Sequence, residues 1–249
     1  MNTKDFGYKM ARCAGIAYLD GKEAKPKYKE LGYTGHRFFD TEGAQCHVAW
    51  NKEILTIAFR GTEVKELSDV KADLNVDSVK AEYFHGNVHE GFQTEVDKLW
   101  NIIVTYVMKN KKDRTIFVTG HSLGAAMATI VAARFYKLKF KLGGLYTYGS
   151  PRVGNKKFRD ALGVNHYRFV NNSDDVTKIP FYHWGYRHHG NLRYINSKGK
   201  VKIGTDVWKR TLDRLKGRWQ GFKNKNYFDG ISDHSVDKYA AHLSDYTEV

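Results

Sequence analysis

The hydrophobic positions of this chain follow two spacings, one typical of helices and one typical of strands. Residues 5–18 and 90–108 place apolar side chains three or four positions apart, which predicts two amphipathic helices. The longer stripe consists of Phe92, Val96, Leu99, Trp100, Ile103 and Val107. Three short β-rich runs predict strands at residues 35–40, 45–50 and 54–59. A polar turn at residues 51–53 joins the last two of these strands.

Strand-like and helix-like runs alternate through the rest of the chain. The pattern predicts strands at residues 144–148 and 165–170, a short helix near 156–162, a hairpin at 192–195 and 200–203, and helices near 206–216 and 234–245. Such alternation favours a mainly parallel sheet with helices on both faces, which the N-terminal hairpin extends in the antiparallel sense. Because no internal repeat or low-complexity linker interrupts the 249 residues, we expect a single domain over residues 1–249.

Composition narrows the class of protein. The chain is 41% hydrophobic, and no run approaches the about 18 apolar residues of a membrane span, so no transmembrane helix is expected. The N-terminus lacks the apolar core of a signal peptide, which leaves a cytoplasmic protein or a secreted one whose signal has been removed. Cys13 and Cys46 could pair, but two thiols form no disulfide framework and are more typical of small buried apolar groups.

The formal net charge is +14, which favours contact with anionic surfaces. Residues 198–225 carry ten basic and two acidic side chains. Within this segment an apolar stripe at helical spacing is formed by Trp208, Leu212, Leu215 and Trp219. A basic amphipathic helix can lie on an anionic membrane, or it can pack on the core with its lysines in solvent. We favour packing for the stripe and expect the charge to support peripheral contact with an anionic lipid interface.

The candidate chemistry begins at Gly120-His121-Ser122-Leu123-Gly124, between an apolar strand and a helix of small residues. This strand–turn–helix setting is what a Gly-x-Ser-x-Gly nucleophile elbow requires. The turn exposes the serine hydroxyl at the carboxyl edge of a sheet, and a Cβ at either glycine would strike a neighbouring element. The pattern therefore predicts acyl transfer through an ester of Ser122.

A serine nucleophile needs a base and a group that orients the base. In sheets of this kind the chain order is Ser, then Asp or Glu, then His. Asp174 and Asp175 follow the strand at 165–170, and His234 opens the last predicted helix. His242 is an alternative base, but it lies two turns into that helix. For the oxyanion, one donor is the N–H of Leu123 and the other comes from the loop after the strand at 54–59.

Taken together, these motifs resemble the fungal-type class 3 lipase family over residues 10–245. The resemblance is carried, in chain order, by Phe59-Arg60-Gly61-Thr62, Asp73-Leu74, Val88-His89-Glu90-Gly91-Phe92, Thr119 to Ala125, Tyr148 to Asn155, Asn171 to Pro180, and Asp233-His234. It implies an α/β-hydrolase fold with a short lid segment and no cofactor. It also implies site residues: Ser122 as nucleophile, Asp174 as orienting acid, His234 as general base, Thr62 and Leu123 as the oxyanion hole, and Asp73 as a support for the loop of Thr62.

Three departures from the family pattern affect details. Asp175 follows Asp174 where the family usually has an apolar residue after the acid; counting back from Pro180 selects Asp174 as the acid and leaves Asp175 as the runner-up. The segment between Thr62 and Asp73 is about two residues longer than in the fungal enzymes, and Val70 stands where the family often has tryptophan. That segment is the lid in the family, and here its apolar stripe is modest, so we expect weak interfacial activation.

The resemblance implies hydrolysis of carboxylic esters, with acylglycerols as the expected substrates and a monomer as the expected state. Phospholipase A1, feruloyl-type esterase and acyltransferase share this machinery and remain alternatives. An alternative of a different class is a non-catalytic protein that binds anionic surfaces; nucleic acid is not an expected partner. His183, His188 and His189 cluster, but their spacing matches no common zinc pattern, so no metal is expected.

Overall fold

The computed structural model describes residues 3–62, 77–204 and 233–244. The described chain forms an eight-stranded sheet in the order β1-β2-β3-β6-β7-β9-β11-β12. Its strands are β1 (Gly35–Thr41), β2 (Ala44–Trp50), β3 (Ile54–Phe59), β6 (Thr115–His121), β7 (Leu142–Tyr148), β9 (His166–Asn171), β11 (Asn191–Ile195) and β12 (Val201–Ile203). The five strands from β3 to β11 are parallel, and β1, β2 and β12 are antiparallel to their neighbours. The predicted mainly parallel sheet with an antiparallel N-terminal hairpin is confirmed.

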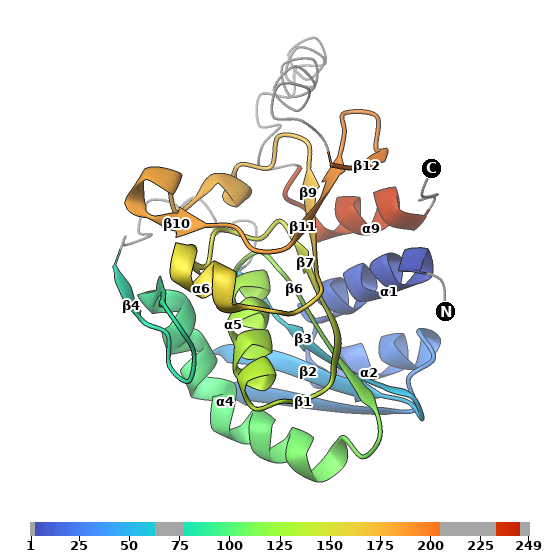
Figure 1. Cartoon of the computed structure of the whole chain (residues 1–249). Helices are drawn as coiled ribbons and strands as arrows, with labels where there is room; N and C mark the ends of the chain where they lie inside the picture. The colour runs from blue at the N-terminus through green and yellow to red at the C-terminus, as the bar shows by residue number, and fades with distance from the viewer. Residues whose placement is uncertain (1–2, 63–76, 205–232, 245–249) are drawn as a thin grey trace.

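Helices cover both faces of this sheet (Figure 1). One face carries α1 (Thr3–Ile16), α2 (Gly21–Glu30) and α9 (Val236–Ser244), and the other carries α4 (Glu90–Asn110), α5 (Leu123–Lys137) and α6 (Lys156–Ala161). Every residue of the predicted α4 stripe is buried, and α5 is buried from Gly124 to Phe135 because it lies between α4 and the sheet. None of the helices in the described ranges is both long and apolar enough to cross a membrane.

The parallel strands end side by side at one edge of the sheet, and this edge positions the candidate site. Phe59 at the end of β3 pairs with Gly120 of β6, and His121 pairs with Tyr148 at the end of β7. Tyr148 in turn pairs with Phe169 of β9. The loops that follow these four strands therefore emerge beside one another, although they are up to about a hundred residues apart in the chain.

Two features were not anticipated from the sequence. One is α2, which is highly charged and contains Pro26. The other is a four-stranded sheet in the order β10-β8-β5-β4, made of β4 (Ser78–Lys80), β5 (Asn87–His89), β8 (Gly154–Asn155) and β10 (Tyr186–Arg187). Strands of two or three residues are too short to show an alternating pattern, so periodicity could not reveal them.

Some predictions need correction or fall outside the described residues. The last helix begins at Val236 rather than at residue 234, so His234 precedes it. The expected lid, Asp73, and the basic segment with its predicted helix at 206–216 lie outside the described ranges. Cys13 and Cys46 are both free and buried, and burial raises the pKa of the Cys13 thiol to about 12.

Candidate active site

The elbow places Ser122 in a backbone conformation that few residues other than glycine adopt. Its φ is 57° and its ψ is −128°, and its N–H donates to the carbonyl of Tyr148 at 3.0 Å. Ser122 is also the N-cap of α5, yet its side chain makes no capping hydrogen bond. A strained serine whose hydroxyl is not used for capping is typical of a site where strain serves function.

The two elbow glycines are required by close contacts. A Cβ on Gly120 would lie 2.2 Å from the carbonyl oxygen of Gly124, and one on Gly124 would lie 2.4 Å from the carbonyl oxygen of Phe59. Real Cβ atoms do not approach backbone atoms so closely. The expectation that each glycine is needed to avoid a neighbouring strand or helix is confirmed.

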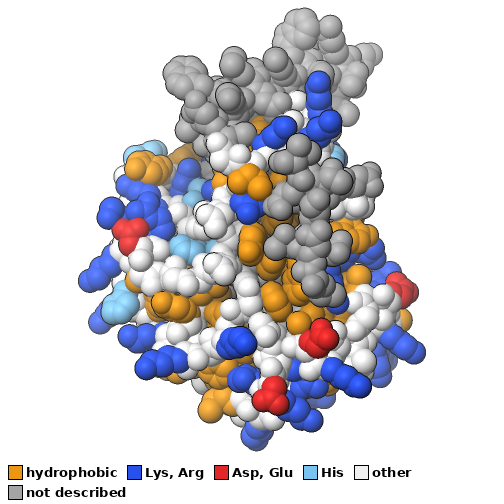
Figure 2. Space-filling view, turned by 45° about the vertical axis from the view of Figure 1, so that its right-hand side comes forward, with side chains coloured by type: hydrophobic (Ala, Val, Ile, Leu, Met, Phe, Trp, Pro, Cys, Tyr) orange, Lys and Arg blue, Asp and Glu red, His pale blue; other side chains and the backbone are white. Residues whose placement is uncertain are grey.

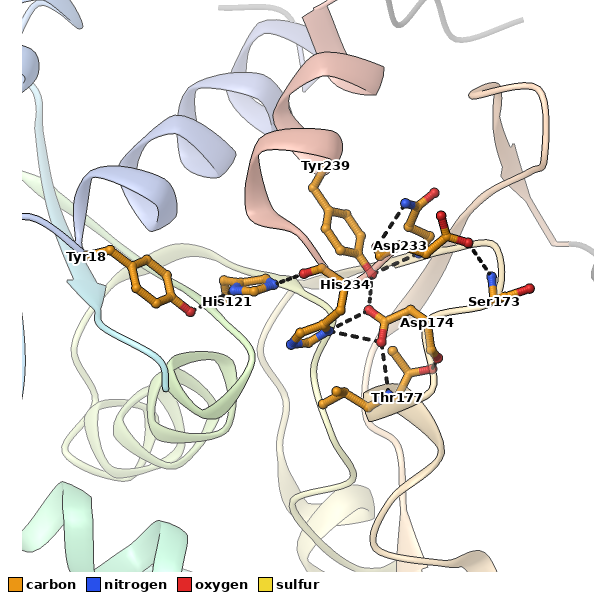
Figure 3. A network of polar contacts seen from close by, with 10 residues as sticks. Tyr18, His121, Ser173, Asp174, Thr177, Asp233, His234 and Tyr239 are labelled. Atoms are coloured by element: carbon orange, nitrogen blue, oxygen red, sulfur yellow. Dashed lines mark hydrogen bonds and ion pairs between the residues drawn. The ribbon is translucent and has the colours of Figure 1, made fainter. Parts of the chain in front are cut away.

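Asp174 and His234 form a fully buried pair at the same edge (Figure 3). Nδ1 of His234 lies 3.0 Å and 2.9 Å from the two carboxylate oxygens of Asp174. Burial by itself would raise the pKa of Asp174. The charge of His234 and the hydrogen bonds from His234 and Tyr239 outweigh this effect and hold the pKa of Asp174 below its usual value. The carboxylate is therefore ionised at neutral pH and fixes the proton of His234 on Nδ1.

The loop of Asp174 is fastened to the segment of His234 by several hydrogen bonds. Asp174 also accepts from the backbone N–H of Val176 at 3.0 Å and from the hydroxyl of Tyr239 at 2.6 Å. Asn171 donates from its side chain to the carbonyl of Asp233 at 2.9 Å, and the carboxylate of Asp233 accepts from the N–H of Ser173 at 3.1 Å. The candidate acid and the candidate base are thus held together by contacts beyond their own.

His121, the residue before Ser122, connects the elbow to the base (Figure 3). Its Nε2 lies 2.5 Å from the carbonyl oxygen of His234, and its Nδ1 lies 2.8 Å from the hydroxyl of Tyr18. Because a carbonyl only accepts, Nε2 carries the proton and Nδ1 accepts from Tyr18. Burial, and next the charge of His234, lower the pKa of His121 to about 3, so this ring stays neutral. The two imidazole rings lie 4.4 Å apart between centroids.

The second ring nitrogen of His234, Nε2, is not the one that contacts Asp174. Nε2 of His234 is buried and has no hydrogen-bond partner among the described residues. The Ser122 hydroxyl therefore does not bond to it in this structure. Such contacts are often long in enzymes without substrate and shorten in the reacting complex. An unpartnered buried acceptor next to the elbow is the atom that a proton from Ser122 would need.

The two candidate oxyanion donors, Leu123 and Thr62, both lie at the elbow. Leu123 is the first residue of α5, so its N–H has no acceptor within the helix. Gly61, beside Thr62, packs against the elbow: a Cβ there would lie 2.5 Å from the carbonyl oxygen of His121 and 3.2 Å from Cβ of Ser122. Thr62, half-buried, follows directly, so the loop after β3 does reach the elbow.

The alternative residues lie elsewhere. Asp175 pairs with Lys178 at 2.5 Å and is partly exposed, so the structure brings Asp174, and not Asp175, to His234. His242 lies on α9 against the turn at Gly199. Together these placements separate the candidate acid and base from their competitors.

The three clustered histidines turn to different partners. His183 is exposed and stacks on Phe181, His188 contacts the carbonyl of Thr177 at 2.8 Å, and His189 contacts the carbonyl of Leu162 at 2.7 Å. In the described part of the chain, no three His, Cys, Asp or Glu side chains are grouped so that they could hold a metal ion.

Sequence reasoning missed two contributors, Tyr239 and the Tyr18–His121 pair. Tyr239 is five residues beyond His234, and no motif marks it as a partner of an acid sixty-five residues upstream. Tyr18 lies more than a hundred residues from His121. Only the packing of α1 and α9 onto the sheet brings these hydroxyls to the site.

A family model described as "Lipase (class 3)" matches residues 56–184, more than half of the chain. This chain belongs to the class 3 lipase family. The matched range contains the elbow, Thr62, Asp73 and Asp174, and it ends before His234. The resemblance noted in the sequence is confirmed at the level of the family.

Two curated relatives of this chain also carry the name lipase. A secreted mono- and diacylglycerol lipase A of Penicillium camembertii is 34% identical over 116 residues, which are 43% of this chain and 38% of that protein. A lipase of Rhizomucor miehei is 32% identical over 168 residues, 62% of this chain and 46% of that protein. The match thus spans less than half the length of each of these curated relatives.

Among solved structures, a triacylglycerol lipase whose catalytic centre is described as a serine protease triad superposes with a TM-score of 0.67. It is 26% identical, and the match covers 80% of this chain and 81% of that one. The class 3 lipase described here therefore has the α/β-hydrolase fold that the sequence predicted.

Proposed function

We propose that this class 3 lipase hydrolyses carboxylic esters of acylglycerols through an acyl-enzyme on Ser122. The observation that carries the proposal is the buried Asp174–His234 pair, at 2.9 Å, beside an elbow serine whose hydroxyl is not used for capping. Family membership and the names of the relatives support a lipid ester as the substrate.

The proposed reaction begins with attack by Oγ of Ser122 on the acyl carbonyl. Nε2 of His234 accepts the serine proton, and the ionised carboxylate of Asp174 stabilises the resulting imidazolium through Nδ1. The N–H groups of Leu123 and Thr62 would donate to the oxyanion of the tetrahedral intermediate. In this proposal Asp73 supports the loop of Thr62.

The intermediate then collapses by loss of the alcohol. The proton on Nε2 of His234 passes to the departing alkoxide, which leaves an ester between Ser122 and the acyl group. Water, deprotonated by the same nitrogen, attacks this ester and forms a second tetrahedral intermediate. Its collapse breaks the bond to Oγ of Ser122, which takes the proton back from His234, and the fatty acid is released. No cofactor takes part in these steps, and all the side chains come from one chain, so a monomer would suffice.

The surface charge suggests how substrate is approached. Lys and Arg side chains are spread over the face shown in Figure 2, and few Asp or Glu side chains appear among them. A cationic surface favours lipid aggregates that carry negative charge. Because relatives are named as secreted lipases, we also propose that this protein acts outside the cell.

A substrate series tests the proposal. Purified protein is assayed with p-nitrophenyl esters of increasing chain length, an emulsified triglyceride, a diglyceride, a phospholipid and a feruloyl ester, beside Ser122→Ala. We expect turnover of acylglycerols that is abolished in the variant. Preferred cleavage of the phospholipid would indicate a phospholipase A1, and preferred cleavage of the feruloyl ester would indicate a feruloyl-type esterase. Binding of anionic vesicles without any ester cleavage would indicate a binding protein.

A further inference from the structure

The segment that follows the candidate acid ends in an exposed aromatic turn with no role in the proposed chemistry. The turn is η3 (Tyr182–Trp184) together with Phe181, and none of its residues is buried. Phe181, Tyr182 and Trp184 are 45%, 60% and 45% exposed. Three large aromatic side chains exposed in four successive residues form an apolar patch of a kind that soluble proteins usually keep for binding.

The turn is held in shape by its own contacts. The N–H of Trp184 donates to the carbonyl of Phe181 at 3.1 Å, and Gly185 ends the turn at a φ of 89°. The ring of Trp184 meets the rings of Phe181 and His183 edge-on, at centroid distances of 4.8 Å and 5.3 Å. These rings pack on one another at the surface instead of on the core, so their outer faces are available.

The turn is joined to the edge of the sheet that carries the candidate triad. Arg152 donates from its guanidinium to the carbonyl of Pro180 at 3.0 Å and to that of Lys178, and its N–H donates to the carbonyl of Ile179 at 2.7 Å. Arg152 lies three residues after Gly149, where an added Cβ would come within 2.8 Å of both Asp174 and His234. Figure 1 shows the turn beside β10, at the end of the molecule where β9 also ends.

The chemistry around the turn indicates the kind of partner. The guanidinium of Arg187 lies 3.5 Å from the centroid of the Tyr182 ring, whereas Lys178, partly exposed, forms an ion pair with Asp175 at 2.5 Å. On α6, which contacts β10, the side chain of Lys156 is 73% exposed and forms an ion pair with Asp160 at 2.8 Å. Trp and Tyr prefer the boundary between water and lipid, and a cation next to them, here Arg187, suits phosphate and carboxylate headgroups.

We propose that the aromatic turn 181–184 is the docking element by which this lipase binds the surface of a lipid aggregate. The rings of Phe181 and Trp184 enter the interface, while the guanidinium of Arg187 remains among the headgroups. Because the turn is fastened through Arg152 to the loop at Gly149, this docking directs the triad edge toward the lipid. The choice of partner rests on the proposed function, and the docking itself can be measured without catalysis.

The test compares two double variants in the Ser122→Ala background, so that no lipid is hydrolysed during the measurement. One variant is Phe181→Ala with Trp184→Ala. The matched control is Ile102→Ala with Met108→Ala, which removes two side chains of α4 that are 45% and 68% exposed. Partition onto phosphatidylcholine vesicles and onto vesicles containing phosphatidylglycerol is measured by sedimentation at low and high salt.

We expect the aromatic double variant to bind both kinds of vesicle about ten-fold less tightly, while the α4 control binds like its parent. The remaining binding to the anionic vesicles should fall as salt rises, because it comes from cations. Equal binding by the aromatic variant and the control would overturn the proposal.

A second readout separates this inference from the proposed activity. The same substitutions are made with Ser122 intact and assayed on a dissolved short-chain p-nitrophenyl ester. Turnover should be unchanged, while hydrolysis of an emulsion should fall with vesicle binding. Loss of turnover on the dissolved ester would show that the turn shapes the active site and would overturn the docking role. Absence of ester hydrolysis in the unmodified protein would refute the proposed function but leave the vesicle measurement valid.

Discussion

The hydroxyl of Tyr239 donates a 2.6 Å hydrogen bond to Oδ2 of Asp174, the same oxygen that lies 2.9 Å from Nδ1 of His234. That hydroxyl also accepts the backbone N–H of Asn171 at 2.9 Å. Tyr239, a residue of the last helix, thereby holds both the carboxylate of Asp174 and the end of β9, the strand that precedes the loop of Asp174. The candidate acid is held by α9 as well as by its own loop.

Replacing Tyr239 by Phe should weaken catalysis and stability together. Loss of the hydroxyl leaves the N–H of Asn171 buried without a partner, which costs about 1–3 kcal/mol. It also removes one of the contacts that lower the pKa of Asp174, so this pKa should rise. As the pH is lowered, the activity of the variant should therefore begin to fall at a higher pH than that of the unmodified protein. We expect kcat on a soluble ester to fall about ten-fold with little change in KM.

The matched control is Tyr33→Phe. Tyr33 is also buried, and its hydroxyl contacts Thr56 at 2.6 Å, on the strand β3. This variant should lose stability but keep its kcat and its pH profile. Equal effects of the two substitutions on kcat would show that Tyr239 acts only through stability.

Gly149→Ala tests the close packing around the base. Gly149 has a φ of 60°, and a Cβ there would lie 2.8 Å from Oδ2 of Asp174 and from two ring atoms of His234. Gly32→Ala is the control, because Gly32 has a φ of 79° with nothing within 4 Å of the added Cβ. Both variants should lose about 1–2 kcal/mol of stability, because an alanine is held at a positive φ. Only Gly149→Ala should lower kcat, by at least ten-fold, as measured with a soluble ester; similar kcat values would contradict the packing argument.

The buried histidines predict instability in mild acid. Burial lowers the pKa of His47 and His121 to about 3 and that of His36 to about 4. The unfolded chain takes up these protons below about pH 6.5, and the folded chain does not until much lower pH. The free energy of unfolding is therefore greatest above pH 6.5 and declines as the pH falls toward 4. For a fully buried ring such as His121 the slope approaches about 1.4 kcal/mol per pH unit.

Urea unfolding at several pH values measures this slope. His47→Gln removes one of the groups, so its stability should depend less steeply on pH between 6.5 and 4. A profile that is flat over this range, or that has the same slope in the variant, would show that these rings are protonated in the folded state.

The sequence of the expected lid predicts weak interfacial activation. Its larger apolar residues are Val64, Leu67 and Val70, and they are interspersed with charged residues. Activity on a short-chain ester should therefore rise smoothly as the substrate passes its solubility limit. Kinetics across that limit provide the measurement, and a several-fold jump would contradict the expectation.

The parts of the fold that sequence predicted are those with a strong local pattern. The stripe of α4 shows apolar residues at helical spacing, and β1 to β3 appear as short β-rich runs. The elbow was predicted from Gly120 and Gly124 on either side of Ser122. The helix α2 carried an overlooked signal, since Asp20 caps it through the N–H groups of Lys22 and Glu23.

The rest depends on tertiary contacts that no local pattern encodes. Asp174 and Asp175 are adjacent and chemically alike, so only the count back from Pro180 separated them in sequence. In the fold, one turns inward to His234 and the other turns outward to Lys178. The hydroxyls of Tyr18 and Tyr239 reach the site because α1 and α9 pack on the same face of the sheet.

The central claim is that Ser122 is the nucleophile, activated by His234. The most direct measurement is labelling of the native protein with a fluorophosphonate, followed by mass spectrometry of its peptides. We predict one adduct, on Ser122, that is absent in Ser122→Ala and forms at least a hundred-fold more slowly in His234→Ala. An adduct on another residue, or ester hydrolysis that persists in Ser122→Ala, would contradict the account.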